Sequence, residues 1–183
     1  MATYKPSKTV VVDEMTVDLK VPAIAAFWAW MIPGAGHFYQ RRYRKAALFS
    51  FCVFSIYLLG MLIGAGKVVY AKWDVEEKRW PFLCQVGSGI ITFPAVIQAY
   101  RNTKNQPLLW NEFMAPPTAQ KLSEWNRELA SGFDIGTLYT MVAGLMNYLI
   151  IFDAFFGPLP MPADSSSKGK KSNNPSKDDT PTG

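Results

Sequence analysis

The chain has 183 residues, a formal net charge of +5 and 49% hydrophobic residues. Its basic residues are spread over both ends and over every connection between long uncharged runs. This distribution disfavours a nucleic-acid-binding patch and favours a lipid bilayer as the partner. The longest connection between those runs, residues 101–134, has only 34 residues, which leaves little room for a soluble catalytic domain. We therefore expect an all-α integral membrane helical bundle.

The first apolar stretch, residues 21–39, is interrupted near its middle. Pro33 removes an amide donor, and Gly34 and Gly36 loosen the backbone. Residues 22–32 alone would be about 16 Å long as a helix, too short for a hydrocarbon core of about 30 Å. The pattern predicts a short inserted or re-entrant helix followed by a tight turn. A bent full crossing is the alternative.

The only histidine of the chain and its densest group of basic residues follow this turn. His37, Arg41 and Lys45 are spaced by four residues, so a helix would place them on one face, with Arg44 adjacent. At the headgroup level this face suits an anionic lipid phosphate or a partner, and the alternative is that these residues set only the topology. A histidine without a nearby cysteine or carboxylate is a poor metal ligand, so we expect no metal and no cofactor.

Three uncharged runs are long enough to cross a membrane. Residues 46–66 and 80–100 have 21 residues each, about 31 Å as a helix. The third run lies between Asp134 and Asp153, and we expect its span to cover residues 135–156. The sequence therefore predicts three full spans in addition to the short first helix.

Lysine and arginine residues near the span ends set the expected orientation. The basic connector after the first stretch is expected in the cytoplasm. Three successive crossings would then place residues 67–79 outside, residues 101–134 inside and the C-terminal tail outside.

Polar segments flank and interrupt the membrane domain, which we assign to residues 21–156. Residues 1–20 form a polar N-terminal segment without the features of a cleavable signal peptide. Residues 118–130 have apolar positions at spacings of three and four after Thr118, a good capping residue, and predict an interfacial amphipathic helix. Residues 157–183 are rich in proline, serine and lysine without an apolar period, which predicts a disordered tail.

Small residues recur at four-residue spacing in the spans, a pattern that lets helices approach closely in lipid. The helix-packing candidates are Gly60, Gly64, Gly136, Thr140, Gly144 and Asn147. We expect them to pack within the chain, with contact to another subunit as the alternative. Asp153 is expected at a membrane interface, and the alternative is an intramembrane proton or ion group.

Two segments resemble known sequence patterns. PGAGHFYQRRYRKAALF, residues 33–49, resembles the signature PGxGHxYxGRxxKGxLF of small bacterial membrane proteins, which is itself similar to the glycine-rich turn of the two-transmembrane domain family. DIGTLYTMVAGLMNYLIIFDA, residues 134–154, resembles the closing span of an uncharacterised bacterial family whose members pair both motifs. The chain departs from the first pattern at Arg41 and Ala46, where the signature has glycine. The resemblance implies a multi-spanning membrane fold and implies no activity.

No arrangement of residues typical of an enzyme is evident in the sequence. We expect a non-enzymatic integral membrane protein of the bacterial inner (cytoplasmic) membrane, acting as an accessory or assembly subunit of a membrane complex. The alternative is a lipid-interacting or small pore-forming homo-oligomer. The expected partners are the lipid bilayer and either another membrane protein or further copies of this chain, and no nucleic acid.

Overall fold

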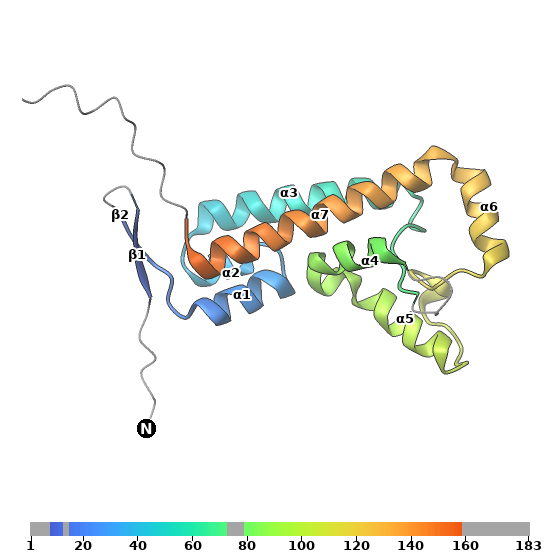
Figure 1. Cartoon of the computed structure of the whole chain (residues 1–183), viewed down its shortest axis with the longest axis horizontal. Coiled ribbons are helices and arrows are strands. Elements are labelled where there is room, and N and C mark those ends of the chain that lie inside the picture. Colours follow the sequence, from blue (N-terminus) through green and yellow to red (C-terminus); the bar gives the residue numbers. More distant parts are fainter. Residues whose placement is uncertain (1–7, 13–14, 73–78, 159–183) are drawn as a thin grey trace, which may run out of the picture.

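The computed structural model describes residues 8–12, 15–72 and 79–158. In chain order its elements are β1 (Thr9–Val12), β2 (Met15–Asp18), α1 (Pro22–Met31), α2 (Ala35–Tyr39), α3 (Tyr43–Ile63), α4 (Trp80–Gln85), the 3-10 segment η1 (Val86–Thr92), α5 (Phe93–Thr103), the 3-10 turn η2 (Trp110–Glu112), α6 (Ala119–Leu129) and α7 (Ser131–Phe156). The two longest helices, α3 and α7, lie side by side and are the spine of the bundle (Figure 1).

Within the described part of the chain, three helices are long and apolar enough to cross a membrane: α3, α7 and the Trp80–Thr103 run that joins α4, η1 and α5. The expected all-α membrane bundle is therefore confirmed. Glycines let α3 and α7 approach each other, because a Cβ atom on Gly136 would lie 2.6 Å from the carbonyl oxygen of Gly60. Such close contact holds helices together in lipid, where apolar burial supplies no driving force between them.

α1 and α2 form a hairpin too short to cross, in agreement with the short re-entrant helix expected from the sequence. α1 begins at Pro22, a residue suited to the first turn of a helix, and has ten residues. After Pro33, Gly34 adopts the left-handed conformation with φ of 86°, which favours glycine. The chain then reverses, and Gln40 after α2 lies again beside Leu19, which precedes α1.

The Trp80–Thr103 run is also bent back on itself. Within η1, Gly89 has φ of 74° and ψ of −137°, outside the helical region. Before this break α4 packs along α7, where Gln85 bonds to Thr140. After the break α5 returns toward the end of the bundle from which α4 starts (Figure 1). There Gln98 bonds to the connection that leads to α6.

The tips of the two hairpins meet inside the bundle. The rings of Trp30, near the end of α1, and Phe93, at the start of α5, have centroids 6.2 Å apart. A Cβ atom on Gly89 would lie 2.6 Å from the carbonyl oxygen of Met31 and still closer to that of Trp30. Glycine is therefore required at this position both by its backbone conformation and by the lack of space.

The return of α5 corrects the expected topology. The sequence-based orientation places residues 67–79 and 101–134 on opposite sides of the membrane. In the structure the two segments meet at one end of the bundle, where Lys67 Nζ lies 3.1 Å from Glu128 Oε2. The two segments lie together because the break at Gly89 turns the chain back between them.

The peripheral elements cap the two ends of the bundle (Figure 1). α6 matches the expected amphipathic helix, and the backbone N–H of Lys121 donates to Thr118 Oγ1 at its start, at 3.4 Å. At the opposite end, within the polar N-terminal segment, β1 and β2 pair antiparallel, with Thr9 opposite Asp18. The predicted disorder of the tail concerns residues that lie outside the described part of the chain, apart from residues 157–158.

Candidate functional site

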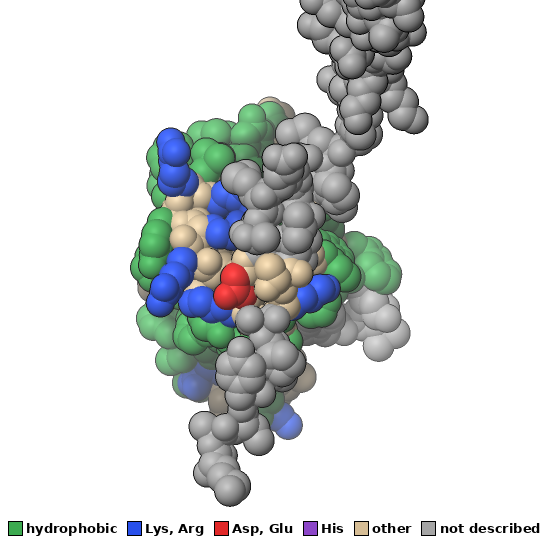
Figure 2. Space-filling model, turned by 90° about the vertical axis from the view of Figure 1, so that its left-hand side faces the viewer, with side chains coloured by type: hydrophobic (Ala, Val, Ile, Leu, Met, Phe, Trp, Pro, Cys, Tyr) green, Lys and Arg blue, Asp and Glu red, His purple; other side chains and the backbone are tan. Residues whose placement is uncertain are grey.

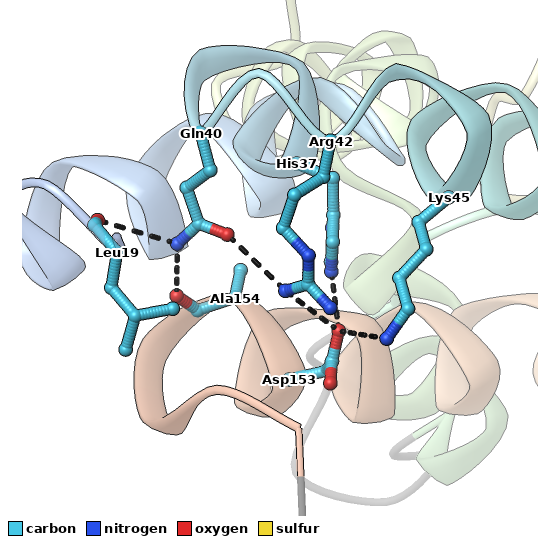
Figure 3. Close-up of polar contacts among 7 residues, drawn as sticks. All are labelled: Leu19, His37, Gln40, Arg42, Lys45, Asp153 and Ala154. Atoms are coloured by element: carbon cyan, nitrogen blue, oxygen red, sulfur yellow. Dashed lines mark hydrogen bonds and ion pairs between the residues drawn. The ribbon is translucent and has the colours of Figure 1, made fainter. Parts of the chain in front are cut away.

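A carboxylate at the end of α7 gathers basic side chains from the start of the chain. Asp153 Oδ2 lies 2.5 Å from His37 Nε2, 3.4 Å from Arg42 Nη1 and 3.9 Å from Lys45 Nζ (Figure 3). His37 comes from α2, Arg42 from the turn after it and Lys45 from the first turn of α3. We call these four residues the Asp153 cluster.

The members of the Asp153 cluster differ in burial. The His37 side chain is fully buried, Arg42 is 13% exposed, Asp153 is 23% exposed and Lys45 is 45% exposed. Because a carboxylate only accepts hydrogen bonds, the proton of the shared bond is assigned to His37 Nε2. His37 Nδ1 has no hydrogen-bond partner among the described residues, and the ring packs edge-on against Phe49 at 5.0 Å. The short bond to His37 is therefore shielded from water, whereas Lys45 contributes at the rim.

Gln40 extends the Asp153 cluster by a second, uncharged connection. Its buried side-chain Nε2 donates to the carbonyl oxygen of Ala154 at 2.6 Å and, at 3.5 Å, to that of Leu19 (Figure 3). Beside it, Lys20 Nζ donates to the carbonyl oxygen of Tyr39 at 2.6 Å. The end of α7, the α1–α2 hairpin and the segment before α1 are thus fastened at one point. The arrangement acts as a clamp on the hairpin.

This end of the molecule carries a clear excess of positive charge. Five basic residues and no acidic residue occur between positions 20 and 45, and Asp153 compensates part of that charge. Figure 2 shows Lys and Arg side chains distributed around this end, next to hydrophobic surface. Among the described residues no group of three or more His, Cys, Asp or Glu side chains is placed to hold a metal ion. The charged side chains described at this end are therefore mainly basic.

The structure separates the four basic residues predicted to act together. α2 ends at Tyr39 and α3 begins at Tyr43, so no continuous helix carries them. The predicted single face is wrong because Arg41, with φ of 62°, breaks the helix between them. His37 and Lys45 meet at Asp153, whereas Arg41 and Arg44 are exposed and have no ion-pair partner in the described part of the chain.

The predicted turn residues Pro33, Gly34 and Gly36 lie where the hairpin reverses against its neighbours. Ser50 Oγ of α3 donates to the carbonyl oxygen of Pro33 at 2.7 Å. A Cβ atom on Gly34 would lie 2.6 Å from the carbonyl oxygen of Ala46. The backbones therefore approach closely here, although this chain has alanine at position 46 where the bacterial signature has glycine.

Most of the predicted packing residues lie along the buried face of α7. Gly136 faces Gly60 of α3 and Gly64, which directly follows α3. A Cβ atom on Gly136 would lie 2.8 Å from the amide nitrogen of Gly64. Thr140 Oγ1 accepts a hydrogen bond from Gln85 at 2.8 Å, and Gly144 packs against the carbonyl oxygen of Cys84. Both α3 and α4 therefore pack against α7.

Asn147 joins both hairpin tips to α7. Its side-chain Nδ2 donates to the carbonyl oxygen of Ala29 at 3.0 Å and to that of Gly87 at 2.8 Å. Both carbonyls belong to segments that end or break inside the bundle, where backbone groups lack helical partners. The side-chain amide of Asn147 thus supplies a hydrogen-bond donor to a backbone carbonyl of each half-length hairpin.

Arg79 holds the base of the second hairpin. Its guanidinium donates to the carbonyl oxygen of Val68 at 2.8 Å and lies over the ring of Tyr70 at 3.7 Å. Burial lowers the pKa of Arg79, and the contact with Tyr70 acts in the opposite direction. Among the described residues, hydrogen bonds and an aromatic ring stabilise this cation.

Sequence reasoning did not find the residues that complete the site. The sequence pattern does not distinguish Arg42 within the basic connector, does not identify Gln40, and does not pair Asp153 with His37. The signal for Asp153 was present, because a carboxylate at the edge of an apolar span needs a basic partner. Its partner is 116 positions away, so no local spacing could identify it.

A family model covers most of the elements described above. The chain belongs to a family of unknown function, DUF6677, whose model matches residues 24–167. This membership agrees with the expectation of an uncharacterised family. No curated protein and no solved structure matches the chain.

Proposed function

We propose that this member of a family of unknown function is a non-enzymatic integral membrane protein that acts by association, as an accessory or assembly subunit of a membrane complex. The observation that carries the proposal is the divergence of α5 from the bundle. α5 makes no extended contact with α3 or α7 and diverges from them (Figure 1). The exposed large apolar or aromatic residues of α5 are Phe93, Val96, Ile97 and Tyr100, and Ile90 of η1, which precedes them, is exposed as well.

The physics of the bilayer favours protein contact at these exposed residues. Irregular backbone at membrane depth is tolerated where protein or water satisfies its polar groups. On one side the irregular segment η1 is covered by the end of α1 and by α7. On the other side Ile90 is 48% exposed, directly after the non-helical Gly89. A helix of another subunit placed along α5 would complete the cover.

The Asp153 cluster supports the same proposal. Its polar groups bond to one another, and the neighbouring Gln40 bonds to Ala154 at the end of α7, which is the behaviour of a structural centre. Location in the bacterial inner membrane, with the basic end in the cytoplasm, is part of the proposal. It rests on the apolar helices, on the bias of positive charge and on the resemblance of residues 33–49 to bacterial proteins.

Site-specific photocrosslinking in native membranes tests the association. A photoreactive amino acid at Ile97 of α5 is expected to give a discrete adduct with a different polypeptide. The matched control is Phe51 of α3, an apolar position that is 72% exposed and lies outside the diverging hairpin. Lipid adducts alone at both positions would contradict the proposal.

A small pore-forming homo-oligomer is the second candidate, favoured by polar atoms at the hairpin tips. Gln85 Oε1, Ser88 Oγ and Asn147 Oδ1 are buried and have no hydrogen-bond partner among the described residues. Such groups are costly in an apolar interior unless water or an ion satisfies them. In the same experiment, an Ile97 adduct of twice the protein's own mass, together with conductance in planar bilayers, would favour this candidate over the accessory subunit.

A further inference from the structure

We propose that the basic end of the molecule binds one anionic diacyl phospholipid, in a groove between α1, α2 and the start of α3. The groove has a volume of about 510 Å³. Its lining consists of Lys20, Trp28, Ile32, Ala35, Phe38, Tyr39, Arg41 and Tyr43. This inference is independent of the proposed association through α5, because it concerns the opposite end of the molecule.

The walls of the groove are apolar and accessible. Trp28 is 44% exposed, Ile32 41%, Phe38 63% and Tyr43 54%. Aromatic residues of this kind are enriched where membrane proteins meet the headgroup region, because they combine an apolar body with a polar edge. The walls therefore suit hydrocarbon chains, and a soluble anion would gain nothing from them.

A second groove of about 420 Å³ lies directly beside the first. The two share Ile32, Ala35, Phe38 and Tyr43 as lining residues, and the second continues along α3 to Ser50. The rings of Phe38 and Tyr43, 5.0 Å apart, stand at their common wall. Two grooves on either side of one aromatic pair match the two acyl chains of a diacyl lipid.

The rim of the first groove carries two cations. Arg41 is exposed and has no carboxylate partner among the described residues, in contrast to Arg42 and Lys45, which share Asp153. Lys20 Nζ is held at the rim by the carbonyl oxygen of Tyr39, at 2.6 Å, and lies 4.7 Å from the centre of the Tyr39 ring. An ammonium group has three donors, so Lys20 retains hydrogen-bonding capacity for a phosphate. The charge at the rim selects an anionic headgroup.

The proposed lipid contact differs from the one predicted from the sequence in the basic residues that it involves. His37 is fully buried and cannot reach a headgroup, and Arg44 does not line either groove. Arg41 alone of the four predicted residues lines the first groove, where Lys20 joins it. Arg41 and Arg44 thus form a matched pair of exposed arginines at the same end of the bundle, one inside the proposed site and one outside.

Native mass spectrometry of the full chain, released from nanodiscs of equal parts phosphatidylglycerol and phosphatidylcholine, tests the site. The parent protein is expected to retain one phosphatidylglycerol per chain in preference to phosphatidylcholine. Arg41→Gln should lower the retained phosphatidylglycerol about fivefold, and Lys20→Gln should lower it by a similar factor. Arg44→Gln, which removes the same charge outside the groove, should leave it unchanged.

The acyl-chain part of the proposal has its own control. Phe38→Ala, which removes the wall between the grooves, should weaken retention of phosphatidylglycerol several-fold, whereas Phe51→Ala on the exposed face of α3 should not. Equal losses for Arg41→Gln and Arg44→Gln would show diffuse electrostatic attraction without a site and would overturn the proposal. Equal retention of phosphatidylcholine and phosphatidylglycerol by the parent protein would overturn it as well.

Discussion

The two half-length hairpins of this protein, α1–α2 and α4–α5, are attached to the rest of the bundle in different ways. The α1–α2 hairpin packs along α7 and is fastened at its base by the Asp153 cluster and Gln40. The α4–α5 hairpin is fastened through α4 and Arg79, while α5 leaves the bundle. Both helices of the first hairpin thus contact α7, whereas α5 of the second hairpin makes no extended contact with α3 or α7. This difference is the basis of the proposed association through α5.

The largest loss of stability is expected when the packing of α4 against α7 is disrupted. Gly144→Leu would force a side chain into the space occupied by the carbonyl oxygen of Cys84. We expect a loss of about 3 kcal/mol in the free energy of unfolding, because helix backbones must separate. Thermal unfolding in mild detergent measures it. Gly132→Ala, whose Cβ would lie 3.3 Å from the carbonyl oxygen of Ile63, should change stability by less than about 1 kcal/mol. If Gly144→Leu were as stable as the parent, α4 would not seat on α7.

The next largest effect should come from the clamp on the first hairpin. Asp153→Asn leaves Arg42 without its counter-charge and weakens the acceptor of the hydrogen bond to His37, and we expect a loss of about 2 kcal/mol with faster hydrogen exchange in α2. Asp134→Asn is the control, because Asp134 is an exposed carboxylate in the first turn of the same helix. It should lose only about 0.5 kcal/mol, from its interaction with the helix dipole. Equal losses of stability for the two variants would show that Asp153 does not hold the first hairpin in place.

A smaller and local effect is expected at the open hairpin. Gln98 accepts a hydrogen bond from the backbone N–H of Leu109 at 3.0 Å and donates to the carbonyl oxygen of Phe113 at 3.1 Å. Gln98→Ala should raise hydrogen exchange in residues 104–117, with a local loss of about 1 kcal/mol. Exchange in α2 should stay the same. A global destabilisation equal to that of Asp153→Asn would mean that the two hairpins are equally integrated.

The smallest effect is expected for the ion pair that joins the two connections at this end. Lys67 and Glu128 are 33% and 50% exposed, so water screens their attraction. Glu128→Gln should change the free energy of unfolding by less than about 0.5 kcal/mol, measured in the same detergent. A larger loss would show that contact between these connections, rather than packing on α7, holds the second hairpin.

The apolar runs and the first turn could be predicted because they depend on local sequence. Lipid requires long uncharged helices, and Pro33 with its neighbouring glycines marks a reversal. The break at Gly89 carried a similar signal in Gly87 and Gly89, yet a run of 21 uncharged residues also fits a straight crossing. Only the contact of Gly89 with the end of α1 decides between them.

The candidate site was predictable in part. The basic connector identified the end of the molecule at which His37 and Lys45 lie, but not their common partner. Pairing with Asp153 depends on how α7 returns to that end, which is a property of the whole bundle. The left-handed turn at Arg41 separates residues that a four-residue spacing groups together. Long-range pairing and a single backbone conformation therefore account for the differences.

Cysteine accessibility in oriented vesicles tests the arrangement of hairpins most directly, with Cys52 and Cys84 replaced by alanine. Single cysteines are introduced at Ala65, Gln120 and Arg44, all exposed positions. Because α5 returns to the end from which α4 starts, an impermeant thiol reagent should label positions 65 and 120 from the same side and position 44 from the other. Labelling of positions 65 and 120 from opposite sides would show that the Trp80–Thr103 run crosses the membrane in full, and would contradict the account.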